Sequence, residues 1–269
     1  MGKRDDLKGT VALVTGACSG IGLEFCRRLA ERGADIVMVS NRDRELREAA
    51  AGVAEKWGVR TWPLAIDLCR PDAAGAITAK VDESGLDVSM LINDAGIFSF
   101  APVTETPQRK ADCFIDLHVR AVTSLTTTFA RRFVARGGGR ILNMSSMSCW
   151  TPMPGIALYA ATKAYIRVFS RAMAYELADS GVTLTVACPG GIATDLFGLP
   201  ENLKRLAVSI GALQTPEQFT RKALRRMLKG KRQYINGLLN RIGIVAVGMA
   251  PTPLRMAVKR RMLDRGIRR

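Results

Sequence analysis

Tyr159 and Lys163 stand four residues apart within residues 157–178, whose apolar side chains recur at helical spacing. Residues four apart lie one above the other on one face of a helix, so an ammonium group is expected beside a phenol. A nearby cation stabilises a phenolate and is expected to lower the tyrosine pKa from about 10 toward the range of a general acid or base. Ser146 follows an apolar run, and its hydroxyl is expected at a strand end, free to hydrogen-bond a carbonyl oxygen.

A glycine-rich turn lies between a strand-like segment and a helix-like one. Residues 11–14 are apolar throughout, as in a parallel strand covered on both faces, and an amphipathic helix is expected over 23–32. Between them, Gly16 permits a tight turn, Gly20 allows a pyrophosphate to approach, and Gly22 allows close helix packing. Because a helix N-terminus attracts phosphate, this turn predicts a bound dinucleotide.

The end of the next strand-like run, residues 35–39, bears on which dinucleotide binds. A carboxylate at that place would bind the ribose 2′-hydroxyl and select NAD. Ser40 stands there instead, which leaves room for a 2′-phosphate that Arg42 or Arg44 would neutralise. The sequence therefore favours NADP(H) over NAD(H). The alternative is that both arginines are solvated at the start of the following helix.

Three motifs, in this order and spacing, resemble the short-chain dehydrogenase/reductase family. They are Thr15-Gly-Ala-Cys-Ser-Gly-Ile-Gly22, Asn93-Asp-Ala-Gly96, and the set Ser146, Tyr159 and Lys163. The resemblance covers roughly residues 8–236, and Asp94 departs from the asparagine usual in relatives. It implies reversible hydride transfer between a nicotinamide and a carbonyl or secondary alcohol. In that reaction Ser146 orients the oxygen, Tyr159 transfers the proton, and Lys163 lowers the tyrosine pKa and binds the nicotinamide ribose.

The same resemblance implies a set of cofactor-binding positions. Asp67 and Leu68 stand where relatives contact the adenine ring, and Ile192 and Thr194 where they hold the nicotinamide and its carboxamide. The full set is Gly16, Ser19, Gly20, Ile21, Gly22, Ser40, Asn41, Arg42, Asp67, Leu68, Asn93, Ala95, Gly96, Tyr159, Lys163, Pro189, Gly190, Ile192 and Thr194.

His118, the single histidine, stands where relatives carry an asparagine whose backbone holds a water that passes protons to solvent. If His118 joins such a relay as a catalytic residue, its titration near about pH 6.5 is expected in the rate profile. The alternative is a packed histidine satisfied by one backbone hydrogen bond.

The alternation of strand-like and helix-like segments predicts an α/β fold with a Rossmann-type doubly wound parallel sheet. One long helix is expected over residues 107–136, ended by a run of glycines. No linker composition divides the chain, so we expect one catalytic domain over 1–236 and a basic, helical, amphipathic extension over 237–269.

The formal charge of +16 is unevenly distributed, because residues 202–269 hold 17 Lys and Arg against two acids. No aromatic platform is interleaved with these bases, which argues against nucleic-acid binding. The basic tail instead predicts contact with an anionic membrane surface or with the phosphates of an acyl carrier; a solvated helix covering the protein's own surface is the alternative. Residues 238–250 are apolar but too few to span a bilayer.

The six cysteines show no metal-ligand spacing, and with one histidine no metal site is expected. We expect them to be the reduced thiols of a cytoplasmic protein, since the N-terminus carries no apolar signal sequence.

The residues where relatives shape the substrate pocket are apolar, which favours a lipophilic carbonyl. The segment around Ser146 resembles the branch with 3-ketoacyl-CoA reductases and hydroxysteroid dehydrogenases. A sugar or polyol dehydrogenase and a non-catalytic dinucleotide sensor are the alternatives, and a homodimer or homotetramer is expected. The residues at these pocket-shaping positions are Met147, Trp150, Met153, Leu196 and Phe197. Phe98 and Phe100 are further candidates for the wall of the substrate site, with plain packing as the alternative.

Overall fold

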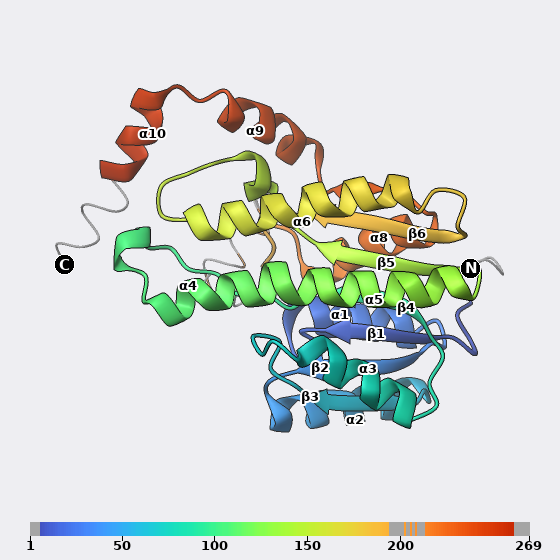
Figure 1. Ribbon diagram of the computed structural model, residues 1–269. Helices are drawn as coiled ribbons and strands as arrows, with labels where there is room; N and C mark the ends of the chain where they lie inside the picture. Colours follow the sequence, from blue (N-terminus) through green and yellow to red (C-terminus); the bar gives the residue numbers. More distant parts are fainter. Residues whose placement is uncertain (1–5, 194–201, 203–204, 206–207, 209–212, 261–269) are drawn as a thin grey trace.

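The computed structural model describes residues 6–193, 202, 205, 208 and 213–260. Within these residues, seven parallel strands form one sheet in the order β3-β2-β1-β4-β5-β6-β7 (Figure 1). This confirms the Rossmann-type doubly wound sheet. The strands are β1 (Val11–Thr15), β2 (Asp35–Ser40), β3 (Thr61–Ala65), β4 (Val88–Asn93), β5 (Gly139–Met144), β6 (Val182–Cys188) and β7 (Gln233–Ile235).

Helices cover both faces of the sheet (Figure 1), because successive side chains of a strand point to opposite faces. Ala12 and Val14 of β1 pack in one core with α1 (Gly20–Ala30), α2 (Asp43–Trp57) and α8 (Pro216–Leu228). Val11 and Leu13 pack in the other core, which is formed with helices of the opposite face. Those helices are α3 (Ala73–Glu83), α5 (Val122–Ala135) and α6 (Ala157–Glu176).

The helix expected over residues 107–136 is not uniform. It consists of α4 (Gln108–Ile115), a π-helical segment, η3 (Asp116–Ala121), and then α5. A π segment inserts an extra residue into a turn and often marks a functional site. Here it carries His118, which lies fully buried beneath the start of the loop after β4.

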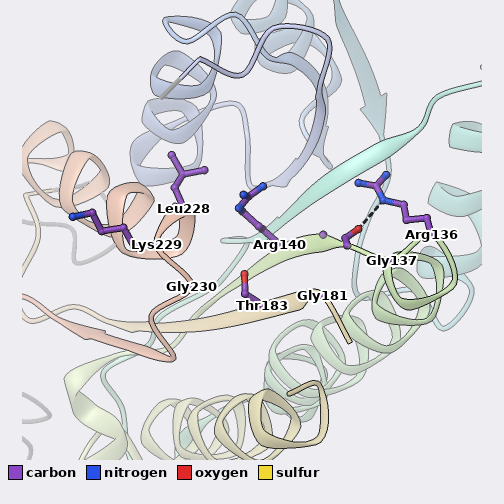
Figure 2. A pocket seen from close by; sticks show the side chains of 10 residues that line it. Arg136, Gly137, Arg140, Gly181, Thr183, Leu228, Lys229 and Gly230 are labelled. Carbon is purple, nitrogen blue, oxygen red and sulfur yellow. Dashed lines mark hydrogen bonds between the residues drawn. The ribbon is translucent and has the colours of Figure 1, made fainter. Parts of the chain in front are cut away.

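Hollows lie at both ends of the parallel strands. One hollow, of about 540 Å³, lies at the amino ends of β5 and β6. It is lined by glycine residues and by Arg136, Arg140 and Lys229 (Figure 2). The other, of about 430 Å³, lies at the carboxyl ends of the strands. Open α/β sheets bind ligands at the carboxyl ends of their strands, so the smaller hollow is the candidate site.

The C-terminal extension forms α9 (Leu238–Gly248) and α10 (Thr252–Val258). In α9, Gly248 lies near the carbonyl oxygen of Trp150, the last residue of the 3₁₀ helix η4 (Met147–Trp150) that follows Ser146. The end of α9 therefore lies beside the segment expected to shape the substrate pocket. In the part of the chain that the structure describes, no helix has the length and apolarity to cross a bilayer.

Candidate active site

The cleft at the carboxyl ends of the strands gathers most of the residues expected to bind a cofactor. Three of the expected site residues are buried and do not line the cleft: Gly22, Asn93 and His118. Thr194 lies outside the described residues. The cleft is lined by Gly16, Ser19, Gly20, Ile21, Ser40, Asn41, Arg42, Asp67, Leu68, Ala95, Gly96, Ser146, Tyr159, Lys163, Pro189, Gly190 and Ile192. Sequence reasoning did not assign the further lining residues Cys18, Ile66, Cys69, Asp94, Ile97, Cys113, Leu117, Met144 and Ser145 to the site.

Tyr159 and Lys163 lie on one face of α6, and both are buried. The Lys163 ammonium lies 5.7 Å from the centre of the Tyr159 ring and donates a hydrogen bond to the Met144 carbonyl oxygen at 3.0 Å. Ser146 caps η4, because its Oγ accepts the Ser148 backbone N–H at 3.1 Å. Its hydroxyl also hydrogen-bonds the Tyr159 hydroxyl. Strand β5 ends at Met144, so Ser146 begins a 3₁₀ turn rather than ending the strand.

The direction of the Tyr159 pKa shift differs from the expectation. Burial raises the pKa of Tyr159 to about 12, although the hydrogen bond with Ser146 lowers it. Burial also lowers the pKa of Lys163 to about 8, while the charge of Asp94 opposes that shift. Desolvation disfavours the charged form of either group, and for Tyr159 it outweighs the hydrogen bond with Ser146. Tyr159 therefore holds its proton at neutral pH and is suited to donate it.

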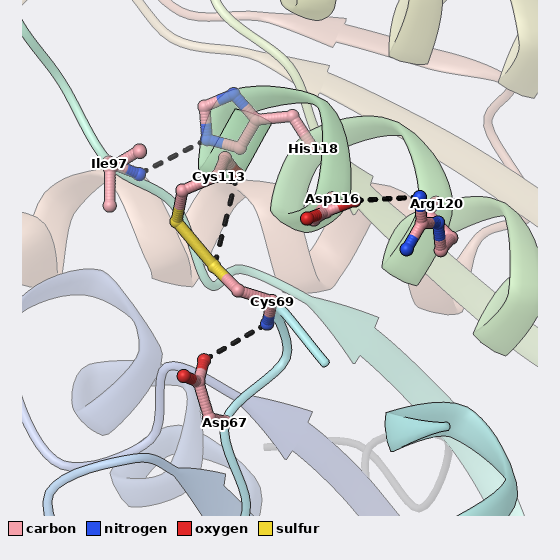
Figure 3. Close-up of a disulfide and its surroundings, with 7 residues drawn as sticks. All are labelled: Asp67, Cys69, Ile97, Cys113, Asp116, His118 and Arg120. Atoms are coloured by element: carbon pink, nitrogen blue, oxygen red, sulfur yellow. Dashed lines mark hydrogen bonds and ion pairs between the residues drawn. A yellow bond between two sulfur atoms is a disulfide. The ribbon is translucent and has the colours of Figure 1, made fainter. Parts of the chain in front are cut away.

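His118 is held by hydrogen bonds at both ring nitrogens. Its Nε2 accepts the Ile97 backbone N–H at 3.1 Å (Figure 3), so the ring proton lies on Nδ1, 2.9 Å from the Thr162 hydroxyl. Burial and the nearby Lys163 cation hold the pKa of His118 well below its ordinary value. An inflection from His118 near pH 6.5 is therefore not expected. A neutral His118 positions the loop that contains Ile97.

The turn between β1 and α1 has the geometry of an anion cradle. Gly16 and Gly20 adopt left-handed φ of 68° and 56°, which a larger residue would adopt only with strain. The first turn of α1 holds no acid, and the N-cap residue Ser19 makes no side-chain cap. Apart from the Gly22 N–H, which hydrogen-bonds Asp94, the N–H groups at the start of α1 thus remain available for an anion, and these residues fit a dinucleotide pyrophosphate.

The end of β2 separates the two arginines considered for a 2′-phosphate. Arg42 turns onto the cleft, where its Nη2 donates to the Ser19 hydroxyl at 2.6 Å and to the Cys18 thiol at 2.9 Å. Arg44 instead lies 3.9 Å from Glu48 on the outer side of α2, with its side chain 84% exposed. Arg42 alone of the two is placed to meet a phosphate in this cleft.

Asn93 turns into the sheet rather than into the cleft. Its Nδ2 donates to Asn143 Oδ1 at 2.9 Å and to the Thr126 hydroxyl at 3.1 Å, and Asn143 Nδ2 donates to the Ser170 hydroxyl at 2.9 Å. This buried network joins β4, β5, α5 and α6. Asn93 therefore braces the strands that carry the site.

A disulfide joins Cys69, in the loop after β3, to Cys113 on α4 (Figure 3). The expectation that every cysteine is reduced is wrong for this pair, because the fold brings two residues separated by 44 positions to a Cα–Cα distance of 5.6 Å. Both cysteines line the cleft next to Asp67, whose carboxylate accepts the Cys69 backbone N–H at 3.0 Å. The disulfide fixes this wall of the cleft. The remaining cysteines, Cys18, Cys26, Cys149 and Cys188, are free thiols.

Aromatic side chains stand next to the proton-transfer group. The Phe98 ring meets the Tyr159 ring edge-on with centroids 5.1 Å apart, and Phe100 packs over Gly155. Trp150 of η4 lies under the Arg167 guanidinium at 4.3 Å. Of the residues expected to shape the substrate pocket, Phe98 thus stands beside Tyr159, but none of those that the structure describes is among the residues that line the cleft. Leu196 and Phe197 lie outside the described residues.

The amino-acid sequence is similar to a family model and to several known proteins. Residues 10–202 match the family model described as short chain dehydrogenase. The chain is 31% identical over 223 residues to a 7beta-hydroxysteroid dehydrogenase of Collinsella aerofaciens, covering 82% of this chain and 84% of that protein. It is 35% identical over 179 residues to a very-long-chain 3-oxoacyl-CoA reductase of Phaeosphaeria nodorum, covering 65% of this chain and 52% of that protein.

Two solved structures are similar over most of the chain. A 7beta-hydroxysteroid dehydrogenase superposes with a TM-score of 0.83 at 28% identity, covering 96% of this chain and 98% of that chain. The L-sorbose reductase of Gluconobacter frateurii, solved with NADPH and L-sorbose, superposes with a TM-score of 0.77 at 27% identity, covering 87% and 97%. The chain spans only 32% of the length of the probable oxidoreductase EphD of Mycobacterium tuberculosis, which it matches at 32% identity over 70% of its own length.

Proposed function

The chain belongs to the short-chain dehydrogenase/reductase family, and on that premise we propose that it is an NADP(H)-dependent oxidoreductase interconverting a lipophilic ketone and a secondary alcohol. One observation carries the proposal. The buried Tyr159 hydroxyl, hydrogen-bonded to Ser146 and near the Lys163 ammonium, lines the same cleft as the anion cradle of the glycine turn. A proton donor and a dinucleotide site thus share one cavity.

The mechanism assigns one task to each residue. When bound, the nicotinamide dinucleotide supplies or accepts the hydride. The Ser146 hydroxyl hydrogen-bonds the substrate oxygen, and Tyr159 donates its proton to that oxygen as charge develops there. Lys163, anchored on the Met144 carbonyl, places a positive charge beside the resulting phenolate. The neutral His118 holds the Ile97 loop and takes no part in proton transfer in this account.

A steroid ketone or a 3-oxoacyl thioester is the proposed substrate class. The apolar side chains beside Tyr159 support it, as do the names of the two relatives above. A sugar or polyol is the second candidate, because a structural neighbour was solved with L-sorbose. A panel of steroid ketones, 3-oxoacyl thioesters and keto-sugars, followed by NADPH absorbance, tests the proposal. Turnover confined to keto-sugars would contradict it, and tight NADPH binding without any turnover would indicate the non-catalytic sensor.

Arg42 is proposed to select NADP(H) by contacting the 2′-phosphate. Arg42→Gln is expected to lower kcat/KM for NADPH by roughly ten- to a hundredfold, the usual worth of a charged hydrogen bond, and to leave kcat/KM for NADH nearly unchanged. Arg44→Gln is the matched control, since Arg44 lies outside the cleft. If Arg42→Gln lowers kcat/KM equally for both cofactors, or if the wild-type enzyme prefers NADH, Arg42 does not select NADP(H).

The basic extension is proposed to dock on an anionic membrane surface and to present the substrate side of the cleft to it. Four large apolar residues of this extension are exposed to solvent: Ile242 by 57%, Met249 by 78%, Leu254 by 55% and Met256 by 40%. The segment is also basic, and α9 ends beside η4. Apolar side chains with adjacent cations suit peripheral membrane binding.

Vesicles of phosphatidylserine and phosphatidylcholine test this docking. Replacing Arg255, Lys259 and Arg260 by Gln is expected to weaken binding roughly a hundredfold at low salt, since each cation contributes about 1 kcal/mol near an anionic surface. Added salt should release the wild type, and pure phosphatidylcholine should not retain it. If the wild type does not bind anionic vesicles at low salt, the proposed membrane docking is excluded. An acyl carrier then remains as the acidic partner.

A homodimer or homotetramer is also proposed. Three large side chains on one face of α6 are exposed: Tyr165 by 37%, Val168 by 60% and Tyr175 by 55%. Large apolar side chains aligned on one helix face suit contact with a second copy of the chain.

A further inference from the structure

Asp94 is an acidic residue that the fold places in the cleft beside the proton-transfer groups. It follows the last residue of β4, and its backbone N–H donates to the Thr15 hydroxyl at 3.0 Å. One of its carboxylate oxygens lies against the glycine turn, 2.9 Å from the place that a Cβ of Gly22 would take. Among the described residues that line the cleft, Asp67 and Asp94 are the acids, and Asp67 lies beside Cys69 in the loop after β3.

The groups that face Asp94 come from two helices. Tyr159 and Lys163 of α6 line the same cleft as Asp94, and the Lys163 ammonium and the Asp94 backbone both lie next to Gly96. The charge of Asp94 acts on these two groups and on the Cys26 thiol of α1. Burial raises the pKa of Asp94 to about 7, while Lys163 and the Gly22 backbone N–H lower it. The carboxyl is therefore ionised at alkaline pH. This is the range in which Lys163, with a pKa of about 8, and Tyr159 lose their protons.

Three further groups face the proton-transfer pair. The His118 ring lies 6.0 Å from the Tyr159 ring and is neutral, because burial holds its pKa well below the ordinary value. A hydrogen bond with Cys149 raises the pKa of Cys188 well above its usual range, so Cys188 is also neutral. The hydrogen bond from Cys188 lowers the pKa of Cys149. Cys149 is thus the other source of negative charge near Lys163 and Tyr159.

We propose that Asp94 is a positioning residue that acts through Tyr159 and Lys163: its negative charge, fixed under the glycine turn, keeps both protons in place and extends carbonyl reduction to more alkaline pH. For Tyr159 this charge adds to the effect of burial, and for Lys163 it opposes burial. A site that retains the phenol proton favours donation to a ketone over acceptance from an alcohol. The inference rests on the oxidoreductase function proposed above.

Asp94→Asn removes the charge and keeps the shape of the side chain, including an oxygen that can accept the Gly22 N–H. With saturating NADPH, the pH at which kcat/KM for ketone reduction falls on the alkaline side is expected to drop by about one unit. Alcohol oxidation, which needs the phenolate, should begin at a correspondingly lower pH. The same shift is expected in a Cys149→Ser background, which removes the other titratable group whose negative charge acts on Tyr159 and Lys163.

A second readout needs neither cofactor nor turnover. Carbon-13 tyrosine NMR follows the ionisation of Tyr159, whose signal is identified by its absence from Tyr159→Phe. In Asp94→Asn this signal is expected to begin moving at lower pH than in the wild type. Glu55→Gln, which removes an equal charge from the exposed side of α2, is expected to change neither the rate profile nor the signal.

The outcomes separate this inference from the proposed function. An inactive wild type whose Tyr159 signal still shifts in Asp94→Asn contradicts the oxidoreductase proposal alone. An active wild type with the same rate profile and the same Tyr159 titration as Asp94→Asn overturns the role of Asp94. Circular dichroism and the melting temperature check the fold, and Asp94→Ser is the second uncharged variant should Asp94→Asn melt early.

Discussion

Tyr159→Phe is expected to lower kcat by roughly a hundred- to ten-thousandfold, the usual contribution of a general acid, while NADPH binding stays close to that of the wild type. The substitution removes the only atom that donates the proton. It retains the ring that packs edge-on against Phe98. Stopped-flow measurement of NADPH oxidation gives the rate, and quenching of protein fluorescence gives the cofactor affinity.

Tyr165→Phe is the matched control for that prediction. Tyr165 lies on the same helix and its hydroxyl bonds the Thr123 hydroxyl at 2.8 Å, outside the cleft. It is expected to retain wild-type kcat. Turnover by Tyr159→Phe within a few-fold of the wild type would exclude Tyr159 as the proton donor.

Gly22→Ala is expected to damage both cofactor binding and the fold. A Cβ at Gly22 would lie 2.7 Å from the Gly16 carbonyl carbon and 2.9 Å from Asp94 Oδ2, and the backbone atoms there have no room to move aside. Overpacking of this kind costs about 1–3 kcal/mol. We expect the Kd for NADPH to rise at least roughly tenfold, because the turn that cradles the phosphates must shift, and the melting temperature to fall.

Gly52→Ala is the control, because a Cβ at Gly52, within α2, would meet nothing within 4 Å. Alanine is favoured over glycine inside a helix by about 0.5–1 kcal/mol, so this variant should melt at or above the wild-type temperature. If Gly22→Ala binds NADPH and melts like the wild type, the glycine turn is not the tight cradle described here.

Much of the fold could be predicted because local patterns and the sheet topology agree. Helix α8 carries its start signal in the sequence, since Thr215 accepts the Gln218 N–H as its cap and Pro216 starts the first turn. Buried parallel strands such as β1 appear in the sequence as short apolar runs. The glycine turn, Ser146, Tyr159 and Lys163 meet in one cleft because the carboxyl ends of parallel strands meet at one edge.

Other features depend on distances that no local pattern reveals. Cys69 and Cys113 lie 44 positions apart in the sequence and meet only in the folded chain. The sign of the Tyr159 pKa shift depends on how much solvent the fold removes, since burial raises this pKa more than the hydrogen bond with Ser146 lowers it. Only the structure separates Arg42 in the cleft from Arg44 outside it. The contact of Asp94 with the glycine turn likewise needed the three-dimensional arrangement.

The central claim is that this cleft transfers a hydride to a lipophilic ketone with Tyr159 as the proton donor. The most direct test uses NADPH that carries deuterium at the transferable position of nicotinamide C4, together with steroid ketones and 3-oxoacyl thioesters. Mass spectrometry of the alcohol should find deuterium on the carbinol carbon with the wild type, and almost no alcohol with Tyr159→Phe. Saturating NADPH binding without deuterium transfer to any of these ketones would contradict the claim.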